Sequence, residues 1–130
     1  MADHPNVELF RRGYTAFQNG DLETVASLFS PAIVWHQGGH NHFSGDHTGV
    51  DEVLALFGRN FAETNGTFKT DVHDIVANDT HGVAIATVSG EKDGKTLNDR
   101  YTHVAHFADG KLTESWIFQE NQPAVDDFWG

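Results

Sequence analysis

The sequence predicts an α+β domain in which three helices pack on one face of a curled mixed or antiparallel sheet and enclose a pocket. Two observations support this class. In the first half of the chain, apolar residues recur at spacings of three and four, the period of helices. In the second half, apolar and polar residues alternate as in strands, and turn signals such as Lys92-Asp93-Gly94 and Asp109-Gly110 separate the segments. Because helices and strands are segregated along the chain, an α+β arrangement is expected.

Three helices are expected in the first half. Asp21 is a plausible N-cap for the second helix, which Ser30-Pro31 would end. The third helix would begin near Val50, where Thr48 and Asp51 resemble a capping box. The apolar faces of the three helices are formed by Val7, Phe10, Tyr14 and Phe17, by Leu22, Val25, Ala26 and Phe29, and by Val50, Val53, Leu54, Phe57 and Phe61.

Five strands are expected. A short one over Ile33–His36 precedes the third helix, and the other four follow it as a meander. The tail from Pro123 to Gly130 carries Phe128 and Trp129, so we expect it to pack onto the domain. The four strands of the meander are expected over Phe68–Ala77, Val83–Glu91, Thr96–Phe107 and Leu112–Gln119.

Composition and charge narrow the functional classes. A chain of 130 residues, 38% of them hydrophobic, suits one domain spanning residues 1–130 with a single core. It has no cysteine, which excludes disulfides and thiolate chemistry. A net charge of −11 repels phosphate backbones and anionic membranes, so neither nucleic acid nor a membrane is an expected partner. The apolar runs are too short to cross a bilayer and the start M-A-D-H-P-N lacks signal-peptide features, so we expect a cytoplasmic protein.

The stretch I-V-W-H-Q-G-G-H-N-H-F-S-G-D-H-T-G, residues 33–49, holds four of the nine histidines. His40 and His42 form an H-x-H pair that, together with His36 or His47, could bind zinc, copper, iron or nickel. The glycines at 38, 39 and 45 favour a loop, which would not hold imidazoles rigidly. We therefore expect no metal and no cofactor, with only His36 facing the pocket. The other three would lie at its mouth and make the opening sensitive to pH; a metal protein is the weaker alternative.

The faces of the last two strands supply candidate pocket residues. In the strand over Thr96–Phe107, alternate residues share a face, so Tyr101 and His103 point the same way as Ala105 and Phe107. Such a face resembles an apolar pocket wall with a polar group on it. One face of the last strand is formed by Leu112, Glu114, Trp116, Phe118 and Glu120.

Four segments resemble one family. They read R-R-G-Y-T-A-F-Q-N-G-D-L, S-L-F-S-P-A-I-V-W-H, G-D-H-T-G-V-D-E-V-L-A-L-F and F-A-D-G-K-L-T-E-S-W-I-F, and they cover nearly the whole chain in the family's order. The sequence thus resembles the SnoaL-like and ketosteroid isomerase-like proteins of the nuclear transport factor 2-like superfamily. The resemblance implies a cone-shaped, cystatin-like α+β barrel, with a bent sheet around an apolar cavity and homodimers formed through the sheet.

The resemblance also suggests roles for single residues. A ketosteroid isomerase uses an aspartate base and an oxyanion hole made of a tyrosine and a protonated aspartic acid. His36 falls at the place of the base, and His103 falls at the place of the protonated acid. The place of the tyrosine falls on Gly13, about 100° of helix rotation before Tyr14. Several family members have an acidic catalytic residue near the strand end where Glu120 stands.

We expect a cofactor-free enzyme that acts on a small apolar carbonyl compound, with His36, His103 and Glu120 as catalytic residues. One imidazole would remove a proton beside the carbonyl and the other would donate a hydrogen bond to the enolate, as in isomerisation, dehydration or cyclisation. The alternative is a ligand-binding or structural dimer without turnover. The two hypotheses differ in whether His36 and His103 line one cavity. The expected ligand-binding residues are Tyr14, Phe17, Trp35, Phe57, Phe61, Tyr101, Trp116 and Phe118.

Overall fold

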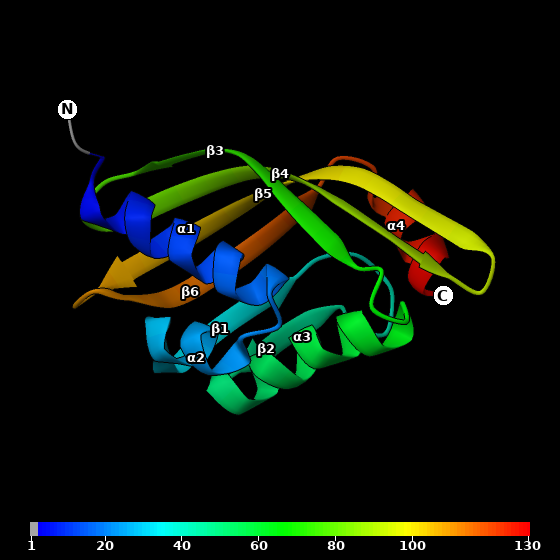
Figure 1. The fold of residues 1–130 in the computed structure, drawn as a ribbon, viewed down its shortest axis with the longest axis horizontal. Coiled ribbons are helices and arrows are strands. Elements are labelled where there is room, and N and C mark those ends of the chain that lie inside the picture. Colours follow the sequence, from blue (N-terminus) through cyan, green and yellow to red (C-terminus); the bar gives the residue numbers. More distant parts are fainter. Residues whose placement is uncertain (1–2) are drawn as a thin grey trace.

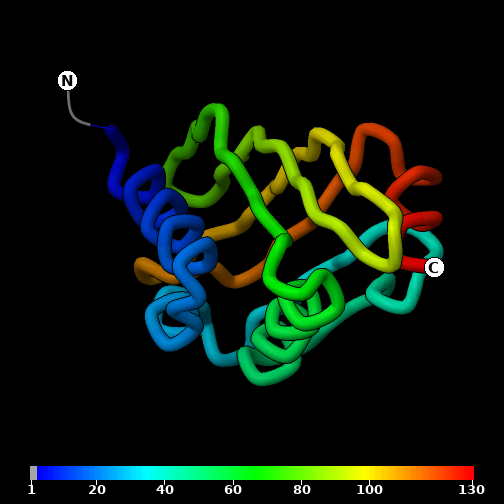
Figure 2. The backbone as a smooth tube through the Cα atoms, turned by 45° about the vertical axis from the view of Figure 1, so that its right-hand side comes forward, coloured from blue at the N-terminus to red at the C-terminus, as the bar shows by residue number. Residues whose placement is uncertain are grey.

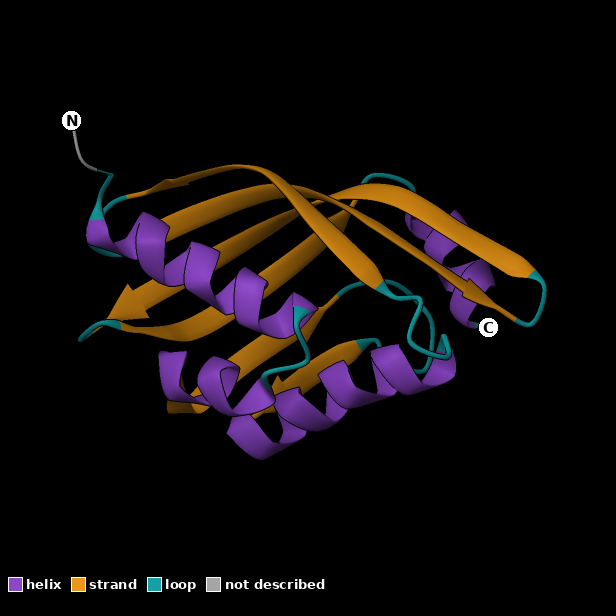
Figure 3. Cartoon of the chain, viewed as in Figure 1, coloured by secondary structure: helices purple, strands orange, loops and turns teal. Residues whose placement is uncertain are grey.

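The computed structural model describes residues 3–130, and within this range the chain forms four helices and one six-stranded sheet (Figure 1, Figure 3). In the same range no helix is both long and apolar enough to cross a membrane. The helices are α1 (Pro5–Gln18), α2 (Leu22–Leu28), α3 (Val50–Glu63) and α4 (Gln122–Trp129). The strands are β1 (Phe29–Gln37), β2 (Gly45–Thr48), β3 (Lys69–Ala77), β4 (His81–Lys92), β5 (Lys95–Ala108) and β6 (Lys111–Gln119).

The sheet is mixed and strongly bent. Its strands follow the order β2-β1-β6-β5-β4-β3, and all neighbours are antiparallel except β1 and β6, which run parallel. Helices α1 and α3 lie on the concave side, whereas α4 lies apart from them at the end of the molecule where the chain terminates (Figure 1, Figure 2). The predicted α+β class with a curled sheet is confirmed, with four helices instead of three.

Local signals explain where the first two helices begin. Pro5 stands in the first turn of α1, and the Nδ1 atom of His4 accepts a hydrogen bond from the Asn6 N–H at 3.0 Å. Asp21 caps α2 as predicted, because its Oδ1 atom accepts from the Thr24 N–H at 3.1 Å.

The capping box expected at the start of α3 is wrong. The N-cap is Gly49, with φ of 89°, and no side chain of the described residues caps this helix. Thr48 instead pairs with Val34 in the β1–β2 ladder, which holds it in strand geometry. Glycine tolerates the positive φ that turns the chain from this ladder into the helix.

The segment before α3 contains more strand than expected. β1 begins at Phe29, so Ser30-Pro31 lies inside a strand and does not end the preceding helix. The β1–β6 register is irregular between Phe29 and Val34, and such irregularities are where a strand accepts a proline. The segment expected to be a loop also contains the short edge strand β2, which pairs with the last four residues of β1.

The tail packs onto the domain as expected, and it does so as helix α4. Asn121 caps this helix, and Phe128 and Trp129 are buried. The ring of Trp129 lies 4.7 Å from the ring of Phe43 and 6.0 Å from the ring of Phe68. Helix α4 therefore closes one end of the core.

Candidate functional site

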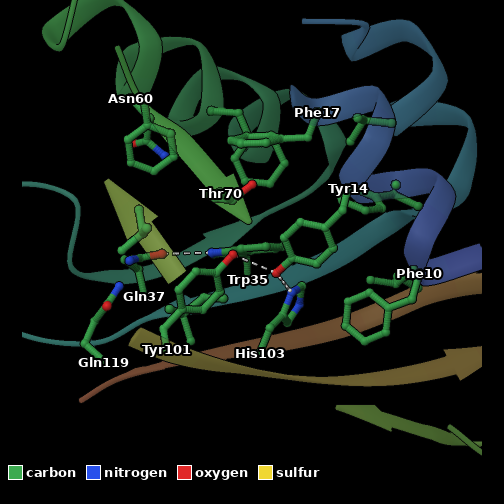
Figure 4. A pocket seen from close by; sticks show the side chains of 18 residues that line it. Phe10, Tyr14, Phe17, Trp35, Gln37, Asn60, Thr70, Tyr101, His103 and Gln119 are labelled. Atoms are coloured by element: carbon green, nitrogen blue, oxygen red, sulfur yellow. Dashed lines mark hydrogen bonds between the residues drawn. The ribbon is translucent and has the colours of Figure 1, made fainter. Parts of the chain in front are cut away.

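A cavity of about 90 Å³ lies between the concave face of the sheet and helices α1 and α3 (Figure 4). This volume is several times the space that one water molecule needs, so a small organic molecule is the appropriate occupant. Its walls are mostly aromatic and aliphatic. The polar side chains on its wall are those of Tyr14, Gln37, Asn60, Thr70, Tyr101, His103 and Gln119.

Four hydrogen-bonded groups run from the cavity into the core. The Tyr101 hydroxyl lies 3.0 Å from the Tyr14 hydroxyl, which in turn lies 2.8 Å from His103 Nδ1 (Figure 4). On the other side of the ring, His103 Nε2 lies 2.8 Å from Ser115 Oγ. Strand alternation places His103 and Tyr101 on the same inward face of β5, as predicted, and Tyr14 reaches them from α1.

The hydrogens of this four-group chain can be placed in three ways, because hydroxyls and neutral imidazole both donate and accept. In one arrangement each group donates to the next toward Ser115, and the Tyr101 oxygen remains free to accept. In a second arrangement each group donates in the opposite direction, and the Tyr101 O–H remains free to donate. In a third arrangement Tyr101 and His103 both donate to the Tyr14 oxygen, which leaves the Tyr14 O–H to donate to a ligand. The cavity can therefore satisfy either a donor or an acceptor on a ligand.

Burial keeps the titratable members of the four-group chain, Tyr14, Tyr101 and His103, uncharged at neutral pH. Desolvation lowers the pKa of His103 to about 3. Desolvation also raises the pKa of Tyr14 and of Tyr101 above the ordinary value for a phenol, and in Tyr14 the neighbouring Tyr101 adds to the increase. A neutral ligand suits this environment better than a charged one.

His36 does not line the cavity. It lies on the outer face of the sheet, where its ring stacks on Trp116 at 5.1 Å, and its two nitrogens lie 2.6 Å from Asp46 Oδ1 and 2.7 Å from Glu114 Oε2. Burial alone would lower the pKa of His36, but these two carboxylates outweigh it and raise the pKa. The β1 register is continuous from Val34 onward, so residues 35 and 37 point inward and residue 36 points outward.

The expected pairing of His36 with His103 is therefore not formed, because the two imidazoles lie on opposite faces of the sheet. His103 lines the cavity, and Trp35 lies beside it, with ring centroids 4.8 Å apart. Without a bulge between Trp35 and His36, only one of these two residues can face inward.

Glu120 is also outside the cavity. It follows the end of β6, is exposed, and forms two hydrogen bonds with Arg100 at 2.7 and 2.8 Å. The guanidinium of Arg100 holds the pKa of Glu120 below its ordinary value. This carboxylate therefore faces solvent and a cation instead of the aromatic walls.

Trp116 and Phe118 were expected in the pocket, but both point to the outer face, and Phe118 is 56% exposed. The cause is a bulge in β6. Phe107 pairs with Leu112 while His106 pairs with Glu114, which leaves Thr113 as one extra residue. The alternation changes phase there, so the inward residues of β6 are Leu112 and then Ser115, Ile117 and Gln119.

Five of the eight expected ligand-binding residues line the cavity, and one packs behind it. Phe61 belongs to the core, since its ring lies 5.0 Å from Phe17 and 5.9 Å from Phe68. Gln37 and Gln119 also line the cavity and were not among the predicted residues. Alternation from Trp35 would have indicated Gln37, but nothing in the sequence marks the bulge that turns Gln119 inward. The five residues in place are Tyr14, Phe17, Trp35, Phe57 and Tyr101.

The loop histidines go to separate places, and none of them lines the cavity. His42 Nε2 lies 2.8 Å from Glu63 Oε1, and His47 Nε2 lies 2.8 Å from the Phe43 carbonyl oxygen. The side chain of His40 is exposed. In residues 3–130 no group of three or more histidine, aspartate or glutamate side chains is arranged so that it could hold a metal ion.

Comparison with known proteins gives the family of this chain. Residues 10–115 match the model of the SnoaL-like domain. Bal32a, from a soil-derived mobile gene cassette, is 34% identical, with a TM-score of 0.94 over 97% of each chain. A Xanthomonas campestris protein of unknown function with a cystatin-like fold is 33% identical, with a TM-score of 0.89 over 95% of this chain and 97% of its own.

The chain also has a relative of nearly the same length. An uncharacterised protein of Mycobacterium bovis is 29% identical over 130 residues, which are 99% of both chains. The match to the family model extends from α1 into β6 and so includes most of the residues that line the cavity, while Ile117 and Gln119 lie beyond it. The chain therefore belongs to the SnoaL-like domain family.

Proposed function

We propose that this chain binds a small, neutral, mostly apolar molecule in the cavity, with an oxygen of the ligand against the hydroxyls of Tyr101 and Tyr14. The observation that carries the proposal is the four-group chain itself, whose outer end is a tyrosine hydroxyl in an aromatic cavity. Ligand sites of this kind combine apolar walls with a few polar groups that fix orientation.

A second candidate is a cofactor-free enzyme that stabilises an enolate in the same place. It is favoured by the 2.8 Å contact between the Tyr14 hydroxyl and His103, because a phenol supported by a second hydrogen-bonding group can donate to a developing oxyanion. The base that removes the proton cannot be His36 or Glu120, because both lie outside the cavity. Among residues 3–130 no carboxylate lines the cavity, so binding is the better supported function.

One experiment separates the two candidates. The protein is titrated with 1-indanone, a small neutral ketone, and binding is followed by NMR; exchange of the ketone's α-protons is then followed in D₂O. We expect saturable binding that weakens about tenfold in Tyr14→Phe, the value of one lost hydrogen bond. The control is Tyr14→Phe titrated with indane, which lacks the carbonyl and should bind equally to both proteins.

The outcomes decide between the candidates. Binding without accelerated exchange supports a binding domain, whereas exchange that is lost in Tyr14→Phe supports the enzyme. If 1-indanone does not bind, or binds both proteins equally, the proposed contact with the tyrosines is wrong.

A further inference from the structure

The end of the cavity formed by β1 and β6 holds two carboxamides that the four-group chain does not use. Gln37 and Gln119 occupy the last positions of these parallel neighbouring strands, and both line the cavity (Figure 4). Gln119 is also the cross-strand partner of Tyr101, so the two carboxamides lie beside the hydroxyl end of the four-group chain.

The two carboxamides differ in how they are satisfied. The Oε1 atom of Gln37 accepts from the Trp35 indole N–H at 2.9 Å, which orients this amide. The Oε1 atom of Gln119 is buried and has no hydrogen-bond partner, alone among the buried side-chain nitrogen and oxygen atoms of residues 3–130. Buried polar atoms are nearly always paired, and an unpaired one destabilises the protein.

The strand end around Gln119 is firmly anchored. The Glu120 N–H donates to the Arg100 carbonyl oxygen at 2.8 Å, and the Asn121 N–H donates to Asp99 Oδ2 at 3.0 Å. These bonds hold the backbone next to Gln119 in place, so backbone movement does not bring the carboxamide into contact with solvent. The terminal torsion of a glutamine is soft, however, so the amide itself can turn toward a ligand.

From this geometry we infer that Gln119 is a specificity-determining residue, which accepts a hydrogen bond from an O–H or N–H donor on the ligand. The inference rests on the proposed function and narrows its ligand class. The ligand carries a donor in addition to its oxygen acceptor, as in a hydroxyketone, an enol, a phenol or a lactam. A simple ketone leaves Gln119 unpaired and binds less tightly.

The test uses two probes of nearly the same size and shape. Isoindolin-1-one carries an N–H next to its carbonyl, and 1-indanone carries a CH₂ at that position. We expect isoindolin-1-one to bind the wild-type protein about tenfold more tightly than 1-indanone, as measured by NMR titration. In Gln119→Met, which keeps the length of the side chain but removes the amide, the two probes should bind within about twofold of each other. Asn98→Met is the matched control, because this exposed carboxamide lies outside the cavity and the preference for isoindolin-1-one should persist.

A second measurement tests the unpaired atom without any ligand. Because Gln119→Met removes a buried acceptor that has no partner, the free variant should melt at the same temperature as the wild-type protein or higher. A lower melting temperature would show that the amide is already satisfied, for example by water, and would overturn the inference.

The binding outcomes also separate this inference from the proposed function. If 1-indanone binds through Tyr14 but isoindolin-1-one binds no more tightly, or if the preference survives in Gln119→Met, the inference fails and the proposed function stands. If neither probe binds, both fail.

Discussion

His103 is buried where a protonated imidazole would have no counter-ion. Its two nitrogens contact only hydroxyl groups, those of Tyr14 and Ser115, and its side chain is almost completely inaccessible. An imidazolium there would lose its hydration without gaining a carboxylate, which is why its pKa falls to about 3. The residue thus acts as a fixed neutral support for Tyr14, and it makes folding sensitive to acid.

The effect of acid on the stability of the fold has a defined direction. Below pH 6.5 the unfolded chain binds a proton at His103, whereas the folded chain resists protonation until about pH 3. The contribution of neutral His103 is fully present above pH 6.5 and is lost as the pH falls toward 3, by on the order of 5 kcal/mol. We expect His103→Gln to be less stable at pH 7 but to lose less stability between pH 6.5 and 4, as measured by urea unfolding.

His73→Gln is the matched control, since its side chain is exposed and its removal should leave the acid dependence of the wild-type protein unchanged. Equal acid dependence in the wild-type protein and His103→Gln would contradict the neutral, buried state of His103.

At the scale of elements, helix α4 and the loop before β2 are held together by one carboxylate. Asp126 Oδ1 accepts from the His40 N–H at 3.0 Å, from Asn41 Nδ2 at 2.8 Å and from Gln122 Nε2 at 3.0 Å. These bonds connect α4 with residues near the end of β1, close to the carboxamide end of the cavity. The position of the loop therefore depends on the tail of the chain.

We expect Asp126→Ala to destabilise the fold by roughly 2 kcal/mol, because three donors lose their acceptor. The amide protons of His40 and Asn41 should also exchange faster with solvent, as measured by hydrogen exchange. Asp127→Ala is the control, since the side chain of this neighbour makes none of these bonds and its loss should change neither quantity. Unchanged exchange in Asp126→Ala would contradict the proposed role.

The elements also show what sequence patterns can and cannot predict. The helices, the meander and the inward direction of Tyr101 and His103 follow from periodicity, because each is a local regularity. The phase of β6 does not, since a single extra residue at Thr113 reverses the side on which every later residue lies. The pairing of His36 with two carboxylates also escaped prediction, because Asp46 and Glu114 reach it from strands that the sequence does not show as neighbours.

At the scale of the whole molecule, the outer face of the sheet is the place where exposed apolar side chains gather. The large hydrophobic side chains exposed in the described range are Val76, Ile85 and Phe118, and all three point to this face. Ile85 and Phe118 lie in one row, joined through Thr102 of β5. His36 on the same face pairs with the carboxylates of Asp46 and Glu114, which offsets part of their negative charge.

We propose that a second copy of the chain covers this face, because a chain with a net charge of −11 can approach a copy of itself most readily where the surface is apolar. We expect a dimer in solution and a monomer for Phe118→Glu, as measured by light scattering coupled to size exclusion. Ala124→Glu, which adds the same charge at an exposed position of α4, should remain a dimer. A wild-type protein that stays monomeric at high concentration would contradict the proposal.

The parallel contact between β1 and β6 also governs how the protein acquires its cavity. Trp35 and Ser115 are register partners although 80 positions separate them in the chain. Pairings between such distant segments are slow to form, since a long stretch of chain must be ordered before they contribute. Local helices and the meander can assemble earlier, but none of them encloses the cavity alone. A ligand will therefore meet its site only once the first and last strands have joined, and its binding will slow unfolding without speeding folding.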